Sequence, residues 1–344
     1  MPAEYGEAII IRTMAEGKPF TIVVDGGPES TADSIVNSLQ EVGHIDMMIL
    51  THFDEDHIFG LIRYVEQFKG KVLPVDTFWC NCAQEIDLAP DSKISDAGYG
   101  NANTLARYLR EQSKVKPDFI WTQDITVAMT QFVKGDLKIQ VLSPTIDILN
   151  ELKDGYNEYV REHAWIDSEE STDIALVGLN PDAKRTIDDL VKKDNPRTVN
   201  LWNKASIAFL LNAEGKQVLM LGDADADIVA ESIENRYGKD AVLDIDLVKL
   251  SHHGSKHNIS KRLLSHIKCN DYAVCTNGGA INFCHPDRKT LALVVRNEKR
   301  APGELRFCFN YPIDKIQERT EVLMTEDEQL HEGCRLIEKK VIRL

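Results

Sequence analysis

The sequence contains no apolar run of about 18 residues, which a membrane-spanning helix would need, and no N-terminal secretion signal is recognisable. Positive charge is also scarce: the 344 residues carry a net charge of −15, which argues against a general electrostatic grip on nucleic acid. The seven cysteines are irregularly spaced, and Cys80 and Cys82 lack zinc-knuckle spacing. These absences favour a cytoplasmic protein with reduced cysteines and no membrane partner.

Apolar residues make up 43% of the chain, which is enough for one large domain or two small ones. Strand-like and helix-like segments alternate, for example a strand over Ile45 to Leu50 and a helix over Ile58 to Phe68. This alternation predicts an α/β fold with functional loops at strand ends. We expect one domain over residues 1–300, with a helical insertion at about 146–200. A β-rich C-terminal extension, residues 301–344, would pack on it.

One loop holds four candidate metal ligands within six residues, directly after the apolar run that ends at Leu50. They are His52, Asp54, Asp56 and His57. Nitrogen and carboxylate ligands this close together suit one or two divalent metals, which lower the pKa of a bound water. A solvated polar turn is the alternative, but further His and Asp motifs recur at later strand ends and favour the metal.

Three of those later motifs could complete a site. Asp223 follows a predicted strand and is either a helix N-cap or a carboxylate that bridges two metals. His252 and His253 would point to opposite sides if the backbone stays extended, so that one binds metal and the other faces substrate. His285 lies beside a predicted helix start and could contact a phosphate oxygen or protonate a leaving group, although it could equally be an ordinary loop residue.

Asp25 could accept a hydrogen bond from the first His loop or close its own turn.

Taken in chain order, these motifs resemble the metallo-β-lactamase superfamily, and most closely the hydrolase domain of the competence protein ComEC and its soluble relatives. The likeness covers most of residues 5–295 and implies a four-layer αβ/βα sandwich with a dinuclear site along one edge. The motifs that carry it are Asp25-Gly26-Gly27, His52-x-Asp54-x-Asp56-His57, Ser143-Pro144, Asn203 to Ser206, Gly222-Asp223, His252-His253-Gly254-Ser255 and Asn282 to Pro286.

The resemblance also implies a role for each residue. A hydroxide bridging two metals would attack phosphorus, with Asp56, His252 and His285 as the catalytic residues. In this assignment His52 and Asp54 hold the first metal, and Asp56, His57 and His253 hold the second. Asp223 bridges the two metals. His252 and His285 face the substrate.

Two positions depart from the family pattern. Asp54 stands where the usual loop has a second His, and Leu142-Ser143-Pro144 lacks the His that the family supplies at that strand end. With these two histidines missing, oxygen atoms of carboxylates and water would make up more of the ligands of the first metal, and such ligands favour manganese or magnesium over zinc. We therefore expect two divalent ions, zinc or manganese, with magnesium as a third option.

The leading functional hypothesis is a metal-dependent phosphodiesterase or nuclease that acts on a nucleotide or short nucleic acid. A hydrolase of an amide, lactone or thioester on the same fold is an alternative, and Asp54 and the His pair weigh against it. A metal-binding regulatory module without catalysis is the third reading. The sequence leaves the oligomeric state open.

Overall fold

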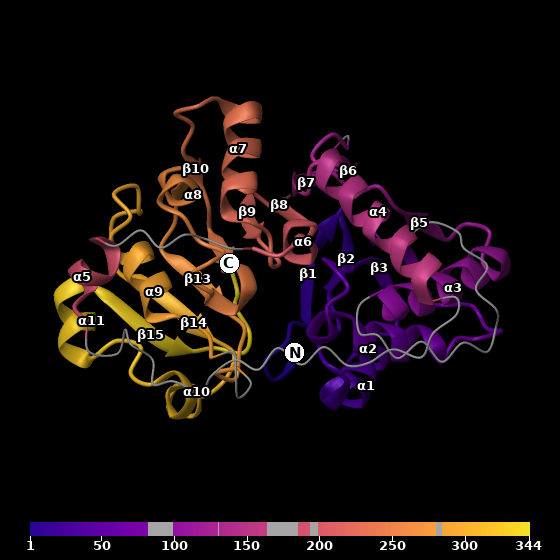
Figure 1. The fold of residues 1–344 in the computed structure, drawn as a ribbon, viewed down its shortest axis with the longest axis horizontal. Helices are drawn as coiled ribbons and strands as arrows, with labels where there is room; N and C mark the ends of the chain where they lie inside the picture. Colours follow the sequence, from indigo (N-terminus) through magenta and orange to yellow (C-terminus); the bar gives the residue numbers. More distant parts are fainter. Residues whose placement is uncertain (82–98, 130, 164–184, 193–198, 280–283) are drawn as a thin grey trace.

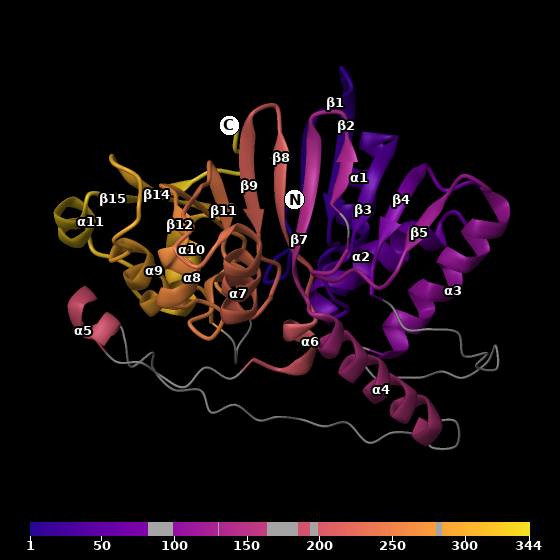
Figure 2. The same ribbon diagram turned by 90° about the horizontal axis from the view of Figure 1, so that it is seen from above.

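Two β-sheets packed face to face form the centre of the molecule, with helices on both outer sides (Figures 1 and 2). The computed structural model describes residues 1–81, 99–129, 131–163, 185–192, 199–279 and 284–344. The first sheet has the order β1-β2-β3-β4-β5 and the second β15-β14-β13-β11-β9-β8-β7-β6, and β10 pairs with β12. The strands are β1 Ile9–Ala15, β2 Lys18–Val24, β3 Ile45–Ile49, β4 Val75–Trp79, β5 Ile120–Thr122, β6 Phe132–Lys134, β7 Leu137–Ser143, β8 Ala208–Ala213, β9 Lys216–Met220, β10 Leu243–Asp244, β11 Leu247–Lys249, β12 Ile267–Lys268, β13 Asp271–Val274, β14 Leu305–Phe309 and β15 Cys334–Glu338.

Three apolar clusters separate four layers. One cluster lies between the two sheets and includes Ile22 and Phe209, the second packs α1 and α2 on the first sheet, and the third packs α7 and α9 on the second sheet. The predicted four-layer α/β sandwich is therefore confirmed. The helices are α1 Ala32–Val42, α2 Glu55–Glu66, α3 Tyr99–Val115, α4 Ile146–His163, α5 Ile187–Lys192, α6 Leu201–Lys204, α7 Ala226–Tyr237, α8 Lys261–Ser265, α9 Arg288–Val295, α10 Ile313–Thr320 and α11 Glu326–Glu332, with short 3₁₀ turns η1 Glu29–Thr31 and η2 Ser251–Gly254.

The strand directions bring the candidate site together. β2, β3 and β4 run parallel, and so do β9, β11, β13, β14 and β15. Because the carboxyl ends of parallel strands meet at one edge of a sheet, the loops after β3, β9 and β11 gather there. Tight hairpins join β1 to β2, β6 to β7 and β8 to β9, and the β8–β9 turn places Glu214 and Gly215 at positive φ, as a type I′ turn requires.

Some predicted bounds differ from the structure. α2 begins at Glu55, so Asp56 and His57 belong to its first turn rather than to a loop before Ile58. Residues 301–344 contain two strands and two helices, and both strands extend the second sheet; the boundary near residue 300 stays a prediction. Within the predicted insertion the described parts include α4 and α5, while 164–184 and 193–198 lie outside the described residues. No helix in the described ranges has the length and apolar character needed to cross a bilayer.

Candidate metal centre

Asp223 occupies the middle of the site. The Nε2 atoms of His57 and His252 each lie 3.6 Å from its Oδ2, and the Nε2 of His52 lies 3.8 Å away. His52, His57 and Asp223 are all buried. Within the described part of the chain, the Nε2 atoms of the two histidines and the Oδ1 of Asp223 have no hydrogen-bond partner. Unpartnered buried polar atoms that converge in this way are costly unless a cation lies among them, so the residues fit a divalent metal.

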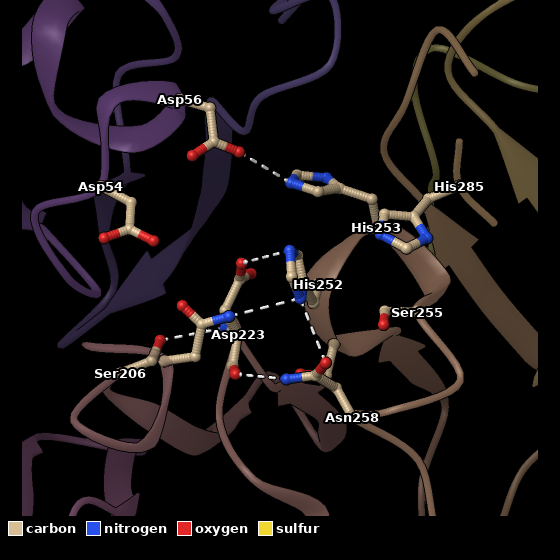
Figure 3. A network of polar contacts seen from close by, with 12 residues as sticks. Asp54, Asp56, Ser206, Asp223, His252, His253, Ser255, Asn258 and His285 are labelled. Carbon is tan, nitrogen blue, oxygen red and sulfur yellow. Dashed lines mark hydrogen bonds and ion pairs between the residues drawn. The ribbon is translucent and has the colours of Figure 1, made fainter. Parts of the chain in front are cut away.

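A second group of ligands shares His57 with the first. The Oδ2 of Asp56 lies 3.1 Å from the Nε2 of His253 and 3.5 Å from the Nε2 of His57. Figure 3 shows Asp56 and His253 pointing toward one another from opposite halves of the sandwich. Because the two groups meet at His57 and Asp223 lies between them, the arrangement suits two neighbouring cations.

Asp54 lies at the rim of the first group. Its Oδ2 is 3.4 Å from the Nε2 of His52, and about a third of its side chain is exposed. It occupies the N-cap position of α2, but its side chain accepts no capping hydrogen bond there. The carboxylate is therefore available to a cation rather than committed to the helix.

Asp25 fixes both histidines of the first loop. Its carboxylate accepts from the Thr51 N–H at 2.7 Å, from the Thr51 hydroxyl at 2.8 Å and from the Nδ1 of His57 at 2.8 Å. Since the Thr51 proton points to Asp25, its Oγ accepts from the Nδ1 of His52 at 3.0 Å. In their neutral form, which a metal ligand must have, both rings therefore carry the proton on Nδ1 and turn the Nε2 lone pair into the site. These contacts confirm that Asp25 accepts a hydrogen bond from the first His loop.

Asn258 sets the protonation of His252. Its Nδ2 donates to the Asp223 carbonyl at 2.7 Å, so its Oδ1 faces the Nδ1 of His252 at 3.1 Å. A carbonyl oxygen accepts, so the His252 proton lies on Nδ1 and the lone pair of Nε2 faces Asp223. Asn203 is the next neighbour, with its Nδ2 3.3 Å from the same ring nitrogen. Ser206 holds the Asp223 backbone by accepting from its N–H at 3.0 Å.

The expected extended backbone at His252 and His253 is wrong. Both residues lie in η2 with positive φ, 46° and 54°. His253 donates through Nδ1 to the Cys275 carbonyl at 2.7 Å, which turns its Nε2 toward Asp56. As a result both Nε2 atoms face carboxylates of the site rather than opposite sides of a strand. Left-handed backbone at two adjacent histidines is strained, and such strain concentrates at functional sites.

The carboxylates dominate the electrostatics of the centre. Burial acts to lower the pKa of His57, but the charges of Asp56, Asp223 and Asp25 raise that pKa well above its usual value. Burial likewise acts to raise the pKa of the Asp223 carboxyl, yet the neighbouring histidines bring that pKa well below its usual range. For His252 burial outweighs the nearby charges and lowers the pKa to about 4. His252 is therefore neutral at pH 7, as a metal ligand must be.

His285 stands next to the ligand cluster. Its ring centroid is 5.2 Å from that of His252, and its Nδ1 lies 3.4 Å from the Oδ2 of Asp287. Asp287 also pairs with the Nζ of Lys256 at 3.1 Å and accepts from the Lys256 N–H at 3.0 Å. Figure 3 places His285 beyond His252 as seen from Asp223. A histidine here can exchange protons with a molecule bound against the cluster.

The family-model comparison covers the first ligand loop. Residues 6–127 match the metallo-beta-lactamase superfamily. That stretch includes the whole loop from His52 to His57, whereas Asp223, His252 and His253 lie beyond it. A search of curated proteins gives no match.

Several solved structures are similar to the chain. The Zn²⁺-bound PqqB of Methylobacterium extorquens shows 12% identity and a TM-score of 0.37, covering 97% of this chain and 87% of that one. The metallo-beta-lactamase fold protein YhfI of Bacillus subtilis shows 9% identity and a TM-score of 0.37, covering 93% and 84%. A Cronobacter sakazakii metallo-beta-lactamase with a HARLDQ motif shows 13% identity and a TM-score of 0.26, covering 63% of this chain and 55% of its own length. At these scores the likenesses carry no argument about function.

One departure from the metallo-beta-lactamase pattern is explained by the structure. Ser143, where the family resemblance leads one to expect a His, is fully buried, and its hydroxyl donates to the Lys204 carbonyl at 3.4 Å. This position therefore supports the fold and offers no ligand to the cluster. A separate surface group of His44, Asp46 and Asp76 has ligand-like spacing, but Asp76 is already paired with the Nζ of Lys116 at 2.8 Å.

The structure thus brings together the residues that the sequence singled out, and their roles stay predictions. Ser206 lies in one of the motifs that carry the resemblance, whereas the sequence reasoning did not single out Asn258, Lys256 or Asp287. Asn258 and Lys256 lie within four residues of Gly254-Ser255, so proximity to the motif was the only signal available for them. The residues that the structure assembles from the prediction are His52, Asp54, Asp56, His57, Asp223, His252, His253 and His285.

Proposed function

We propose that the chain is a metal-dependent hydrolase that cleaves phosphodiesters, with a nucleotide or short nucleic acid as substrate. The observation that carries the proposal is the convergence of the unpartnered Nε2 atoms of His52 and His57 on the buried Asp223 carboxylate. The match of residues 6–127 to a superfamily of largely metal-dependent hydrolases supports it. The closer likeness to the hydrolase domain of ComEC rests on the sequence motifs alone.

The donor set suggests how cations would be held. His52, Asp54 and Asp223 would hold one divalent ion, with His252 close enough to Asp223 to contribute. Asp56, His57 and His253, again with Asp223, would hold the other, and zinc, manganese and magnesium are the candidates. Two such cations lower the pKa of a bound water toward neutrality and offset negative charge on a phosphate.

The side chains around the cluster supply the remaining chemistry. His285 is placed to give a proton to the leaving oxygen, since its ring lies beside His252 and its Nδ1 faces Asp287. The Asp287 carboxylate keeps that ring oriented and ties it to Lys256. The net charge of −15 favours a small anionic substrate over long DNA, and bound cations would supply positive charge at the cluster itself.

Turnover of bis-p-nitrophenyl phosphate tests the proposal. Protein stripped with a chelator should be inactive, and manganese, magnesium or zinc should restore cleavage in the wild type but not in Asp56→Ala. Metal binding without phosphodiester cleavage, together with hydrolysis of a lactone or a thioester, would favour the alternative hydrolase. Binding without any hydrolysis would favour the regulatory module.

We also propose that the protein works in the cytoplasm without a membrane partner. Within the described residues Cys269, Cys275, Cys308 and Cys334 are free thiols, and all of these but Cys275 are buried. Thiols persist in a reducing compartment. Cell fractionation with an antibody to the chain would test the location.

A further inference from the structure

A buried ion pair joins the two halves of the sandwich beside the ligand loops. Glu7, just before β1, pairs with Lys249, the last residue of β11. The side chains are 0% and 1% exposed, respectively. Neither residue belongs to the ligand set, and the two lie 242 positions apart in the chain.

Lysine is an unusual choice at this position. In the ladder Lys249 stands opposite Met220, which belongs to the apolar cluster between the sheets, and Leu247 packs against the same cluster. Alternation along β11 therefore directs the Lys249 side chain into the sandwich interior. Among the described groups the Glu7 carboxylate has no other polar partner, so the Lys249 ammonium alone offsets the cost of burying its negative charge. A buried pair of this kind carries a large desolvation cost and is weak evidence for a purely stabilising role.

Each end of the pair is bonded to a loop that carries ligands. The Nζ of Lys249 donates to the Gly222 carbonyl at 3.3 Å, and the His252 N–H donates to that same carbonyl at 2.9 Å. Gly222 immediately precedes Asp223. On the other side the Glu7 N–H donates to the Asp56 carbonyl at 3.0 Å, and its own carbonyl accepts from Gly27 at 2.8 Å.

We propose that Glu7 and Lys249 are positioning residues that hold the Asp56 turn and the Asp223 loop at the separation a shared pair of cations requires. The proposal rests on the metal-dependent function proposed above. The ion pair links the loops across the interface between the sheets, where the Ile207 N–H also donates to the Thr51 carbonyl at 2.9 Å and the Asp56 and His253 side chains meet. Removing the pair should loosen the ligand geometry even where the fold survives.

Three variants separate positioning from simple stabilisation. Glu7→Gln and Lys249→Met each leave one buried group without its partner, whereas the double variant Glu7→Leu/Lys249→Met replaces both with apolar side chains of similar size. Thermal unfolding reports stability, and calorimetric titration of the chelator-treated proteins with Mn²⁺ and with Zn²⁺ reports metal affinity. The double variant Arg306→Gln/Asp271→Asn, which removes an ion pair between β13 and β14, serves as the control.

The expected result is that the single variants unfold at lower temperature and that the double variant regains much of the loss. Its metal affinity should nevertheless remain about 10- to 100-fold below wild type, which is the usual effect of removing groups that orient ligands. The control should bind metal as wild type does. Full recovery of metal affinity along with stability in Glu7→Leu/Lys249→Met would overturn the proposal and leave the pair a purely structural one.

Glu7→Asp keeps the test decisive if the double variant does not fold. It retains the charge but shortens the side chain by one methylene, so it should fold and still bind metal more weakly than wild type. Unchanged affinity in that variant would refute the positioning role. Failure of the wild type itself to bind Mn²⁺ or Zn²⁺ would instead refute the proposed function, so the two failures are distinguishable.

Discussion

At the residue scale, Asp223 is the point on which the site converges. The Nε2 atoms of His52, His57 and His252 all lie within 3.8 Å of its Oδ2. We predict that Asp223→Ala abolishes turnover and lowers the amount of bound metal, measured by elemental analysis of the dialysed protein.

Asp225 is a matched control for that variant. It is the N-cap of α7 and its Oδ1 accepts from the Asp227 N–H at 2.8 Å. Asp225→Ala should cost about 1 kcal/mol of stability through the lost cap and leave metal content unchanged. Full turnover by Asp223→Ala would remove this residue from the centre of the mechanism.

His285 should separate catalysis from metal binding. Its side chain contacts Asp287 and its ring lies tilted beside that of His252, but it lies outside both groups of ligand atoms. We predict that His285→Ala lowers turnover by about 10²- to 10⁴-fold, the usual contribution of a general acid. Metal content should stay that of wild type, and a loss of metal would instead make His285 a ligand.

Asp287 gives a pH-dependent prediction. Burial acts to raise the pKa of its carboxyl, but the adjacent His285 ring and the charge of Lys256 lower that pKa to about 2 from the ordinary 3.8. A carboxyl with a lowered folded-state pKa stabilises the fold above its ordinary pKa, and this stability is lost as the pH falls from about 4 to about 2.

The change to make is Asp287→Asn. Urea unfolding should show the variant about 2 kcal/mol less stable than wild type at pH 6, with the difference shrinking toward zero near pH 2. A difference that stays the same at both pH values would mean that the charge of Asp287 contributes nothing.

At the element scale, the approach of α2 to the Asp25 loop positions the first ligands. A Cβ on Gly60 would lie 2.1 Å from the Gly26 carbonyl oxygen, and the Gly26 N–H donates to the His57 carbonyl at 2.6 Å. Gly60→Ala should therefore push the first turn of α2 outward. We expect a loss of about 1–3 kcal/mol in stability, seen by urea unfolding, and weaker metal binding.

Gly43 provides the comparison. It caps α1 at φ 79°, and a Cβ there would meet nothing within 4 Å. Gly43→Ala should cost some stability through its backbone conformation alone, with metal binding unaffected. Equal metal binding by Gly60→Ala and wild type would show that the helix can shift without moving Asp56 and His57.

Much of this element arrangement could be predicted from the sequence, and the reasons are local. Apolar runs such as Ile45 to Ile49 end abruptly in polar loops, so strand ends and their His and Asp residues were visible. Apolar periodicity predicts a helix start at Ile58, three residues after the observed start at Glu55, because the first turn of α2 is acidic rather than apolar. Acidic residues such as Glu55 and Asp56 are common in a first helical turn, but they are equally common in loops, so they do not by themselves mark the helix start.

The parts that the sequence did not reveal depend on contacts between distant segments. The left-handed backbone of His252 and His253 follows from packing, because only a small share of histidines adopt positive φ and the sequence does not mark which ones. The Asn258 amide belongs to no motif, and its role appears only when the Asp223 carbonyl is placed beside it. Glu7 and Lys249 each look like ordinary strand residues, and only the register between the sheets makes them a pair.

At the scale of the whole molecule, metal binding and folding should be coupled, since both halves of the sandwich contribute ligands. A ligand that binds only the folded state stabilises it, by about 4 kcal/mol at a free concentration 1,000-fold above its dissociation constant. We predict that adding Mn²⁺ or Zn²⁺ to chelator-treated protein raises the unfolding temperature by several degrees. Asp223→Ala should show no such rise, and an unshifted wild type would speak against ligation from both halves.

The contact between Asp56 and His253 spans 197 residues of chain. A ribosome that adds about 5–20 residues per second therefore needs roughly 10–40 s to supply the second partner after the first. During that interval the nascent chain exposes His52, Asp54, Asp56 and His57 without the residues that complete the cluster. We expect any metal captured at that stage to be held loosely and exchanged freely, so the choice of ion should follow the synthesis of His253 rather than that of the first loop.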